Sequence, residues 1–291
     1  MMPILTLLTA PAFRLITLAF TLLVVATACE DAVTITIENH TPQLVVEGWL
    51  TDQPGVHEVK LSSTLPYNQA DTPPPVTGAS VTLLGNDGTL LAYTEAAPGQ
   101  YLTPANFHGT VGTTYTLAVT LANGTAYTSL PETLLPVVPI DSIYTVVDDD
   151  VAEGEEAALY VAIDFTDPEG EDNYYRWKVY INGEFQDGAD GIYAGSIEDE
   201  GDGEVIEEFT FAEFPLQPGD VVVVEQLSLT EAAQQFFFEV ETQTKATGGP
   251  FDAPEAPIIG NIRLANNPQQ YALGYFGVSA YTARTTVITE N

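Results

Sequence analysis

The one cysteine in the sequence, Cys29, directly follows an apolar segment that runs from Leu15 to Ala28. This segment is shorter than the roughly 20 residues of a transmembrane helix, and its length is typical of the apolar centre of an export signal. A cysteine behind small residues at this place is where bacterial lipoproteins are cleaved and lipidated. The sequence therefore predicts a lipoprotein signal peptide at residues 1–28, which is removed, and a lipidated tether at residues 29–32. In the alternative, Cys29 is an ordinary buried thiol of a secreted chain.

An acidic pair, Glu30 and Asp31, comes directly after the cysteine. It resembles the signal by which some Gram-negative bacteria send lipoproteins to the outer face of the outer membrane. Lipid would hold the chain there, because each buried methylene contributes about 0.8 kcal/mol and more than one acyl chain gives stable attachment. We expect a lipid-anchored protein of the outer membrane that faces the cell exterior.

Common catalytic arrangements are missing from the sequence, which has no Gly-x-Ser-x-Gly, His-Glu-x-x-His, Cys-x-x-Cys or phosphate-binding glycine loop. The three histidines, His40, His57 and His108, are scattered along the chain. Carboxylate pairs that could hydrolyse glycosides must arise by chance among 41 Asp and Glu residues. We therefore expect no catalytic residues and no enzyme activity.

Acidic loops offer the hard oxygen ligands that calcium prefers. The candidate ligands are Asp148, Asp149 and Asp150 in one loop and Asp167, Glu169 and Asp172 in another. A run that begins at Glu198 imitates the start of an EF-hand loop, but Phe209 stands where the bidentate glutamate is required. Two interpretations stay open, a calcium site or solvated acidic loops, and no other cofactor is expected.

Two of the seven basic residues lie on one face of a predicted strand at residues 174–181. Alternation places Tyr175, Trp177 and Val179 on its buried face. The opposite face, which we expect to be exposed, carries the candidate ligand-binding residues Tyr174, Arg176, Lys178 and Tyr180. In an acidic chain, such a face would suit an acidic or aromatic ligand. Alternatively, its two cations pair with carboxylates on neighbouring strands.

The formal net charge is −34, with 41 Asp plus Glu against seven Lys plus Arg. Nucleic acid is excluded as a partner, because too few side chains could neutralise phosphates. The chain should nevertheless fold, since 45 % of its residues are hydrophobic and it holds 14 Tyr and 13 Phe. Its acidic surface is explained either by solubility in a salty medium or by divalent-cation binding.

Apolar and polar residues alternate from Val33 onward, and Asn-Gly pairs at residues 123–124 and 182–183 mark tight turns. The sequence predicts a mainly β protein with an immunoglobulin-like β-sandwich at residues 33–130. A Pro-rich connection at residues 131–140 leads to a second β-rich domain at residues 141–291. One helix is predicted, at residues 231–244, with Thr230 as its N-cap.

Short segments with a recurring order and spacing run through the chain, and they resemble a known family. They lie at residues 44–55, 76–81, 99–101, 112–117, 139–143, 172–176, 248–251, 259–262 and 274–279. Their order and spacing are similar to those of the domain of unknown function 4249 family of bacterial outer-membrane lipoproteins. The resemblance implies a partner of a TonB-dependent receptor in the outer membrane, and it supplies no catalytic residues.

Two classes of function follow from these observations. In the first, the protein is a non-catalytic accessory or ligand-capture partner, a lid, of a TonB-dependent receptor. In the second, it is a structural or adhesive cell-surface protein built from β-sandwiches. A receptor gene next door would favour the first class, and a neighbouring secretion or gliding locus would favour the second.

The lipid anchor can be tested by the substitution Cys29→Ser. We expect this variant to be unprocessed or soluble, because a hydroxyl group cannot accept the thioether-linked diacylglyceryl group. Fractionation of cells, with mass measurement of the product, checks the result. A serine variant that still sediments with outer membranes at wild-type yield would remove the basis for the anchor.

Overall fold

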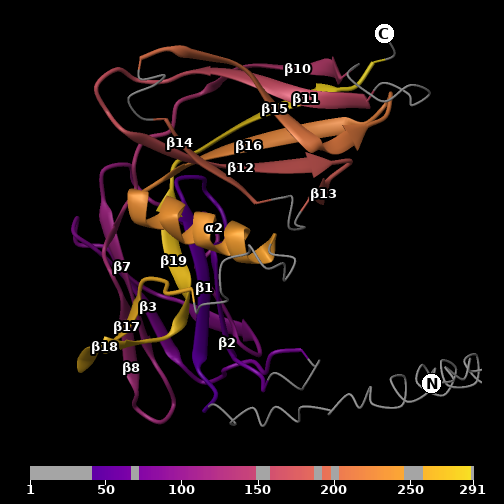
Figure 1. Ribbon diagram of the computed structural model, residues 1–291. Helices are drawn as coiled ribbons and strands as arrows, with labels where there is room; N and C mark the ends of the chain where they lie inside the picture. Colours follow the sequence, from indigo (N-terminus) through magenta and orange to yellow (C-terminus); the bar gives the residue numbers. More distant parts are fainter. Residues whose placement is uncertain are drawn as a thin grey trace, which may run out of the picture. The chain divides into compact units, whose positions relative to one another are not determined.

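The computed structural model describes residues 41–66, 72–148, 158–186, 192–197, 203–245 and 258–289. These ranges form a mainly β protein, as predicted, and they include one helix (Figure 1). Cys29, Glu30 and Asp31 lie outside the described residues, as do the predicted signal peptide and tether. No helix within the described ranges has the length and apolar character needed to cross a membrane.

Two sheets form a first β-sandwich. Its strands are β1 (Leu44–Thr51), β2 (Glu58–Ser63), β3 (Ser80–Gly85), β4 (Leu90–Ala92), β5 (Thr94–Ala97), β6 (Gln100–Leu102), β7 (Thr114–Thr120), β8 (Ala126–Ser129), β9 (Glu132–Thr133), β17 (Ile262–Leu264), β18 (Asn267–Tyr271) and β19 (Leu273–Ser279). One sheet has the order β19-β1-β2-β6-β5, and the other has the order β18-β17-β8-β7-β3-β4, with β9 on β7. Alternating residues of both sheets, among them Val46, Leu61, Leu83 and Leu117, fill one core.

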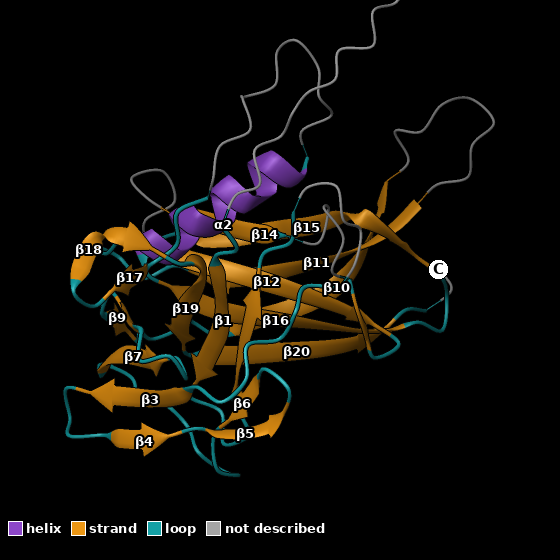
Figure 2. Cartoon of the chain, turned by 90° about the horizontal axis from the view of Figure 1, so that it is seen from below, coloured by secondary structure: helices purple, strands orange, loops and turns teal. Residues whose placement is uncertain are grey.

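A second pair of sheets encloses a separate core. Its strands are β10 (Ile140–Asp148), β11 (Ala158–Thr166), β12 (Asn173–Ile181), β13 (Glu184–Phe185), β14 (Tyr193–Ile197), β15 (Val205–Leu216), β16 (Val221–Leu229) and β20 (Tyr281–Val287). The sheet orders are β10-β11-β15 and β13-β12-β16-β20, with β14 also on β12, and Figure 2 shows β12, β16 and β20 side by side. The core contains Phe165, Trp177, Phe211 and Val224.

Local sequence signals account for several turns and ends. Asn182 and Gly183 both have positive φ, 54° and 83°, in the turn between β12 and β13, which is the backbone that an Asn-Gly pair favours. The helix α2 (Glu231–Thr244) has the predicted bounds. Its cap is also confirmed, because the Thr230 Oγ1 atom accepts a hydrogen bond from the backbone N–H of Ala233 at 3.2 Å.

The C-terminal strands do not all stay with the second sandwich. β19 pairs in parallel with β1, with Trp49 opposite Gly277, and Figure 1 shows the yellow β19 beside the indigo β1. After Ala280, β20 joins β16 in the second sandwich. The predicted second domain at residues 141–291 therefore does not correspond to the second sandwich, because residues 262–279 return to the first sandwich. Alternation indicates which segments are strands but not which strands become neighbours.

A buried carboxyl group ties several of these elements together. Glu132, on β9, is 3 % exposed and accepts hydrogen bonds from Tyr275 on β19 at 2.5 Å and from the helix cap Thr230 at 2.7 Å. Asn261 donates a third hydrogen bond at 3.2 Å. Burial raises the pKa of Glu132, and it outweighs the opposing effect of the three hydrogen bonds.

This raised pKa makes stability depend on pH. The contribution of Glu132 is fully present below the ordinary value of 4.5 and is lost as the pH rises through the folded-state pKa. We expect Glu132→Gln, which keeps the shape but cannot ionise, to lose less free energy of unfolding than the wild type between pH 5 and pH 8. Urea unfolding at both pH values measures the difference, with the exposed Glu184→Gln as control. An unchanged pH dependence in the Glu132 variant would contradict the assignment.

Candidate functional site

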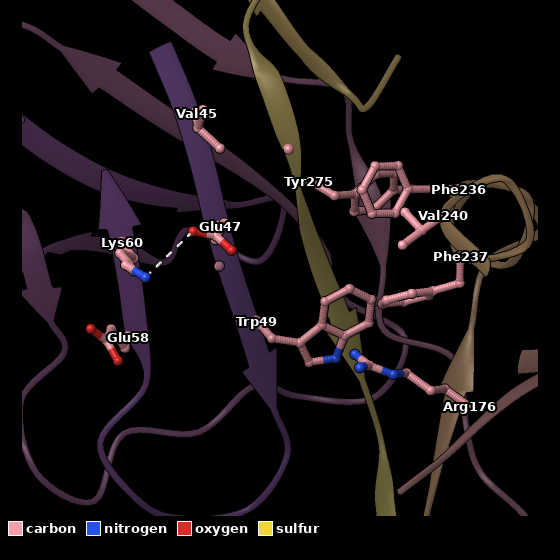
Figure 3. A pocket seen from close by; sticks show the side chains of 12 residues that line it. Val45, Glu47, Trp49, Glu58, Lys60, Arg176, Phe236, Phe237, Val240 and Tyr275 are labelled. Carbon is pink, nitrogen blue, oxygen red and sulfur yellow. Dashed lines mark ion pairs between the residues drawn. The ribbon is translucent and has the colours of Figure 1, made fainter. Parts of the chain in front are cut away.

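A cavity of about 520 Å³ lies between the outer face of the β19-β1-β2 sheet and the helix α2 (Figure 3). We call this cavity the groove. Four aromatic side chains line it: Trp49, Phe236, Phe237 and Tyr275. Four charged residues also line it: Glu47, Glu58, Lys60 and Arg176. Strands from the first sandwich, a helix and one strand of the second sandwich therefore contribute to a single site.

The aromatic wall is held together by its own contacts. The ring centroid of Trp49 lies 5.5 Å from that of Phe237 and 6.3 Å from that of Tyr275. Phe236 and Tyr275 are closer, with 4.8 Å between their centroids. Rings in such tilted and stacked arrangements attract one another beyond the area that they bury. The four side chains thus form one continuous aromatic wall.

Trp49 is fixed in position from two sides. Its indole Nε1 donates a hydrogen bond to the Oγ atom of Ser279 at 2.9 Å. Its six-membered ring lies over Gly277, where a Cβ atom would come within 2.2 Å of the ring. The parallel register of β1 with β19 places the glycine directly opposite the tryptophan. Glycine is needed at this position because the indole occupies the space of a Cβ atom, and not because the backbone has a positive φ.

Arg176 brings a cation to the groove from β12. Its guanidinium carbon lies 4.1 Å from the ring centroid of Phe237, and Figure 3 shows the group extending toward Trp49. The side chain is half-buried, and its Nε atom is buried without a hydrogen-bond partner. Burial lowers the pKa of Arg176 to about 10, against the opposing effect of Tyr180 and Glu225, so the side chain is still charged at neutral pH.

Acidic partners do not neutralise this cation directly. The ion pairs found in the described ranges are Lys60–Glu47, at 3.9 Å on the exposed rim of the groove, and Lys245–Glu241. Glu225 acts on Arg176 through space, but its carboxylate oxygens accept hydrogen bonds from Tyr180 and Tyr281, at 3.3 and 3.2 Å. The guanidinium is thus a largely desolvated cation beside an aromatic wall.

The predicted binding strand is confirmed in its alternation but not in its exposure. Tyr175, Trp177 and Val179 are buried, as expected. Of the opposite face, Tyr174 packs into the small core under α2, and Arg176 lies over Phe237. Lys178 and Tyr180 are half-buried, and Lys178 lies opposite Glu225 in the strand register. The expectation of an exposed four-residue face was wrong, because the helix covers half of it and only Arg176 reaches the groove.

Within the described ranges, the candidate calcium ligands do not form a cluster. Asp167 is buried and accepts a hydrogen bond from the hydroxyl of Tyr175 at 3.0 Å, whereas Glu169 and Asp172 are exposed. Across the described ranges, no group of three or more His, Cys, Asp or Glu side chains could hold a metal ion. Asp149 and Asp150 lie outside these ranges, as does the side chain of Asp148.

Sequence reasoning missed the aromatic residues of the groove. Alternation places Trp49 on the outer face of β1, and α2 carries three consecutive phenylalanines, Phe236, Phe237 and Phe238. Because consecutive residues of a helix point in different directions, these rings cannot all belong to one buried face, and they exceed what that face holds. That excess was the available signal, but it could not show that strand and helix face each other.

The packing of Trp49 over Gly277 can be tested by Gly277→Ala. Because the added methyl group meets the indole ring, we expect a loss of about 1–3 kcal/mol in the free energy of unfolding. We also expect a change in tryptophan emission, since Trp49 must move. Gly55→Ala is a matched control, because the nearest atom to its Cβ would be 3.9 Å away. Unchanged stability and emission in the Gly277 variant would contradict this packing.

Comparisons with known proteins place the chain within one family. It is similar to a solved structure of the fibronectin(III)-like modules of Clostridium thermocellum CbhA, with 16 % identity, 66 % of this chain and 87 % of that chain covered, and a TM-score of 0.22. It is also similar to a two-domain fibronectin type-III segment of chicken tenascin, with 15 % identity, 65 % and 91 % covered, and a TM-score of 0.18. A comparison with curated proteins found no match. Residues 30–285 match the family described as Domain of unknown function (DUF4249), and the chain belongs to that family.

Proposed function

We propose that this protein is a non-catalytic ligand-capture protein that is anchored to the outer membrane through Cys29, faces the cell exterior and serves a TonB-dependent receptor. The observation that carries the proposal is the groove, an aromatic cavity with the desolvated cation of Arg176 at its wall. A cavity of about 520 Å³ is within the size range of small-molecule sites. Rigid aromatic walls with few polar groups are also typical of such sites.

The chemistry of the groove supports binding rather than catalysis. Histidine, serine and cysteine are absent from its described lining, so it holds no Ser–His or Cys–His pair. Its carboxylates, Glu47 and Glu58, are both exposed, and Glu47 pairs with Lys60. The remaining features, an aromatic wall and one guanidinium, hold and orient a ligand without transferring a proton or a group.

The role beside a receptor rests on the predicted anchor and on the family resemblance. A tether of residues 29–32 would span about 14 Å when extended. A receptor in the same membrane would then meet the protein at a high effective concentration, and a modest interface would stay occupied. The protein would act as a lid over the receptor: it would capture the ligand in the groove and pass it to the receptor.

The proposal is tested in cells by filling the groove. Val240 on α2 lines the groove, and we expect Val240→Trp to occupy it. In a deletion strain with a growth defect, this variant should fail to restore growth while the receptor still co-purifies with it from solubilised outer membrane. Phe238→Trp is the matched control, because Phe238 is 52 % exposed on the same helix and does not line the groove.

Two outcomes would contradict the proposal. Full restoration of growth by Val240→Trp would mean that the groove does not serve capture. The structural or adhesive class of function would be favoured if the deletion strain showed no growth or uptake defect and no receptor co-purified with the wild-type protein.

A further inference from the structure

Four of the basic residues in the described ranges form hydrogen bonds or ion pairs within the protein itself. Arg263 donates hydrogen bonds to the backbone oxygens of Gly260 and Ile262, and Arg284 donates one to Ile140 at 2.9 Å. Lys60 and Lys245 pair with glutamates. Arg176 and Lys178 are different, because no hydrogen bond or ion pair of either side chain is found within the described ranges. Of these two residues, only Arg176 lines the groove, and its Nε is buried.

A cation in this situation is costly unless something pairs with it. Burial removes water from the guanidinium, and the face of Phe237 replaces only part of that interaction. An anion that reaches Arg176 through the groove would pair with this cation. Because the net charge of the chain is −34, a general attraction of anions to the surface cannot explain such a site. The residues of the groove itself would have to attract the anion.

The shape and charge of the groove favour a carboxylate over other anions. A guanidinium presents a planar fork of N–H donors that matches the two oxygens of a carboxylate. A phosphate also fits such a fork, but its second negative charge would face Glu47 and Glu58 with only one desolvated cation beside it. The aromatic wall adjoining Arg176 requires an apolar body next to the acidic group.

We infer that the groove binds a ligand with a single carboxylate on an aromatic or other apolar body, with Arg176 receiving the carboxylate and Trp49, Phe236, Phe237 and Tyr275 enclosing the body. This inference rests on the proposed function, because it names the ligand class of the same groove. Two sources share this chemistry, a free aromatic acid and the C-terminal residue of a peptide. In either case the ligand enters past the exposed Lys60–Glu47 rim, whose two side chains are both 57 % exposed.

The test compares two probes that differ only in the acidic group, N-acetyl-phenylalanine and its amide. We expect isothermal titration calorimetry at pH 7 to show that the wild-type protein binds the acid at least about tenfold more tightly than the amide. Arg176→Met keeps an apolar stem but removes the charge, so its affinity for the acid should fall to that for the amide. Lys245→Met removes a cation at the end of α2 outside the groove, and it should leave both affinities unchanged.

The wild-type comparison needs no variant, so it decides the inference even if Arg176→Met fails to fold. Equal binding of acid and amide by the wild-type protein would overturn the carboxylate inference and leave the capture function to the Val240→Trp test. Binding of neither probe would also overturn it. A tetrapeptide that ends in phenylalanine distinguishes the sources: tighter binding than the free acid assigns a peptide C-terminus, and weaker or equal binding assigns a free acid.

Discussion

The parallel pairing of β1 with β19 is the constraint on which the groove depends. It joins Trp49 to Ser279, which are 230 residues apart in the chain, and sets Tyr275 and Gly277 beside the outer face of β1. Since β20 follows directly and belongs to the second sandwich, the same segment also joins the two sandwiches. The strands that form the floor of the groove and the sheet that supplies Arg176 are therefore linked by continuous backbone.

Buried hydrogen bonds stabilise this junction. Glu132 connects β9 to Tyr275, to Asn261 and to the cap of α2, while Ser279 donates to the backbone oxygen of Ser228 at 2.5 Å. Most polar groups in such places need partners, because an unpaired group away from water destabilises the fold. The network consequently fixes the position of α2 against β19. A groove with preset walls binds without the cost of ordering them.

Arg176 gives this rigid site its chemical character. Most of the other basic side chains of the described ranges either pair with a carboxylate or donate to a backbone oxygen, whereas Arg176 faces an aromatic ring. Its desolvation lowers its pKa without removing its charge at neutral pH. An anionic ligand with an apolar body would satisfy both the cation and the wall, and the protein would contribute positioning and water exclusion rather than reaction chemistry.

The sequence by itself determined the elements of this protein. Alternation identified the buried residues of β12, an Asn-Gly pair identified the turn after it, and Thr230 marked the start of α2, because each signal depends only on neighbouring residues. The candidate site was reached in part, through Arg176, but its expected exposure was wrong. Tertiary structure alone decided that β19 returns to β1 and that α2 covers Arg176 and faces Trp49. Strand partners and helix docking depend on contacts between residues far apart in the chain, and no local pattern records such contacts.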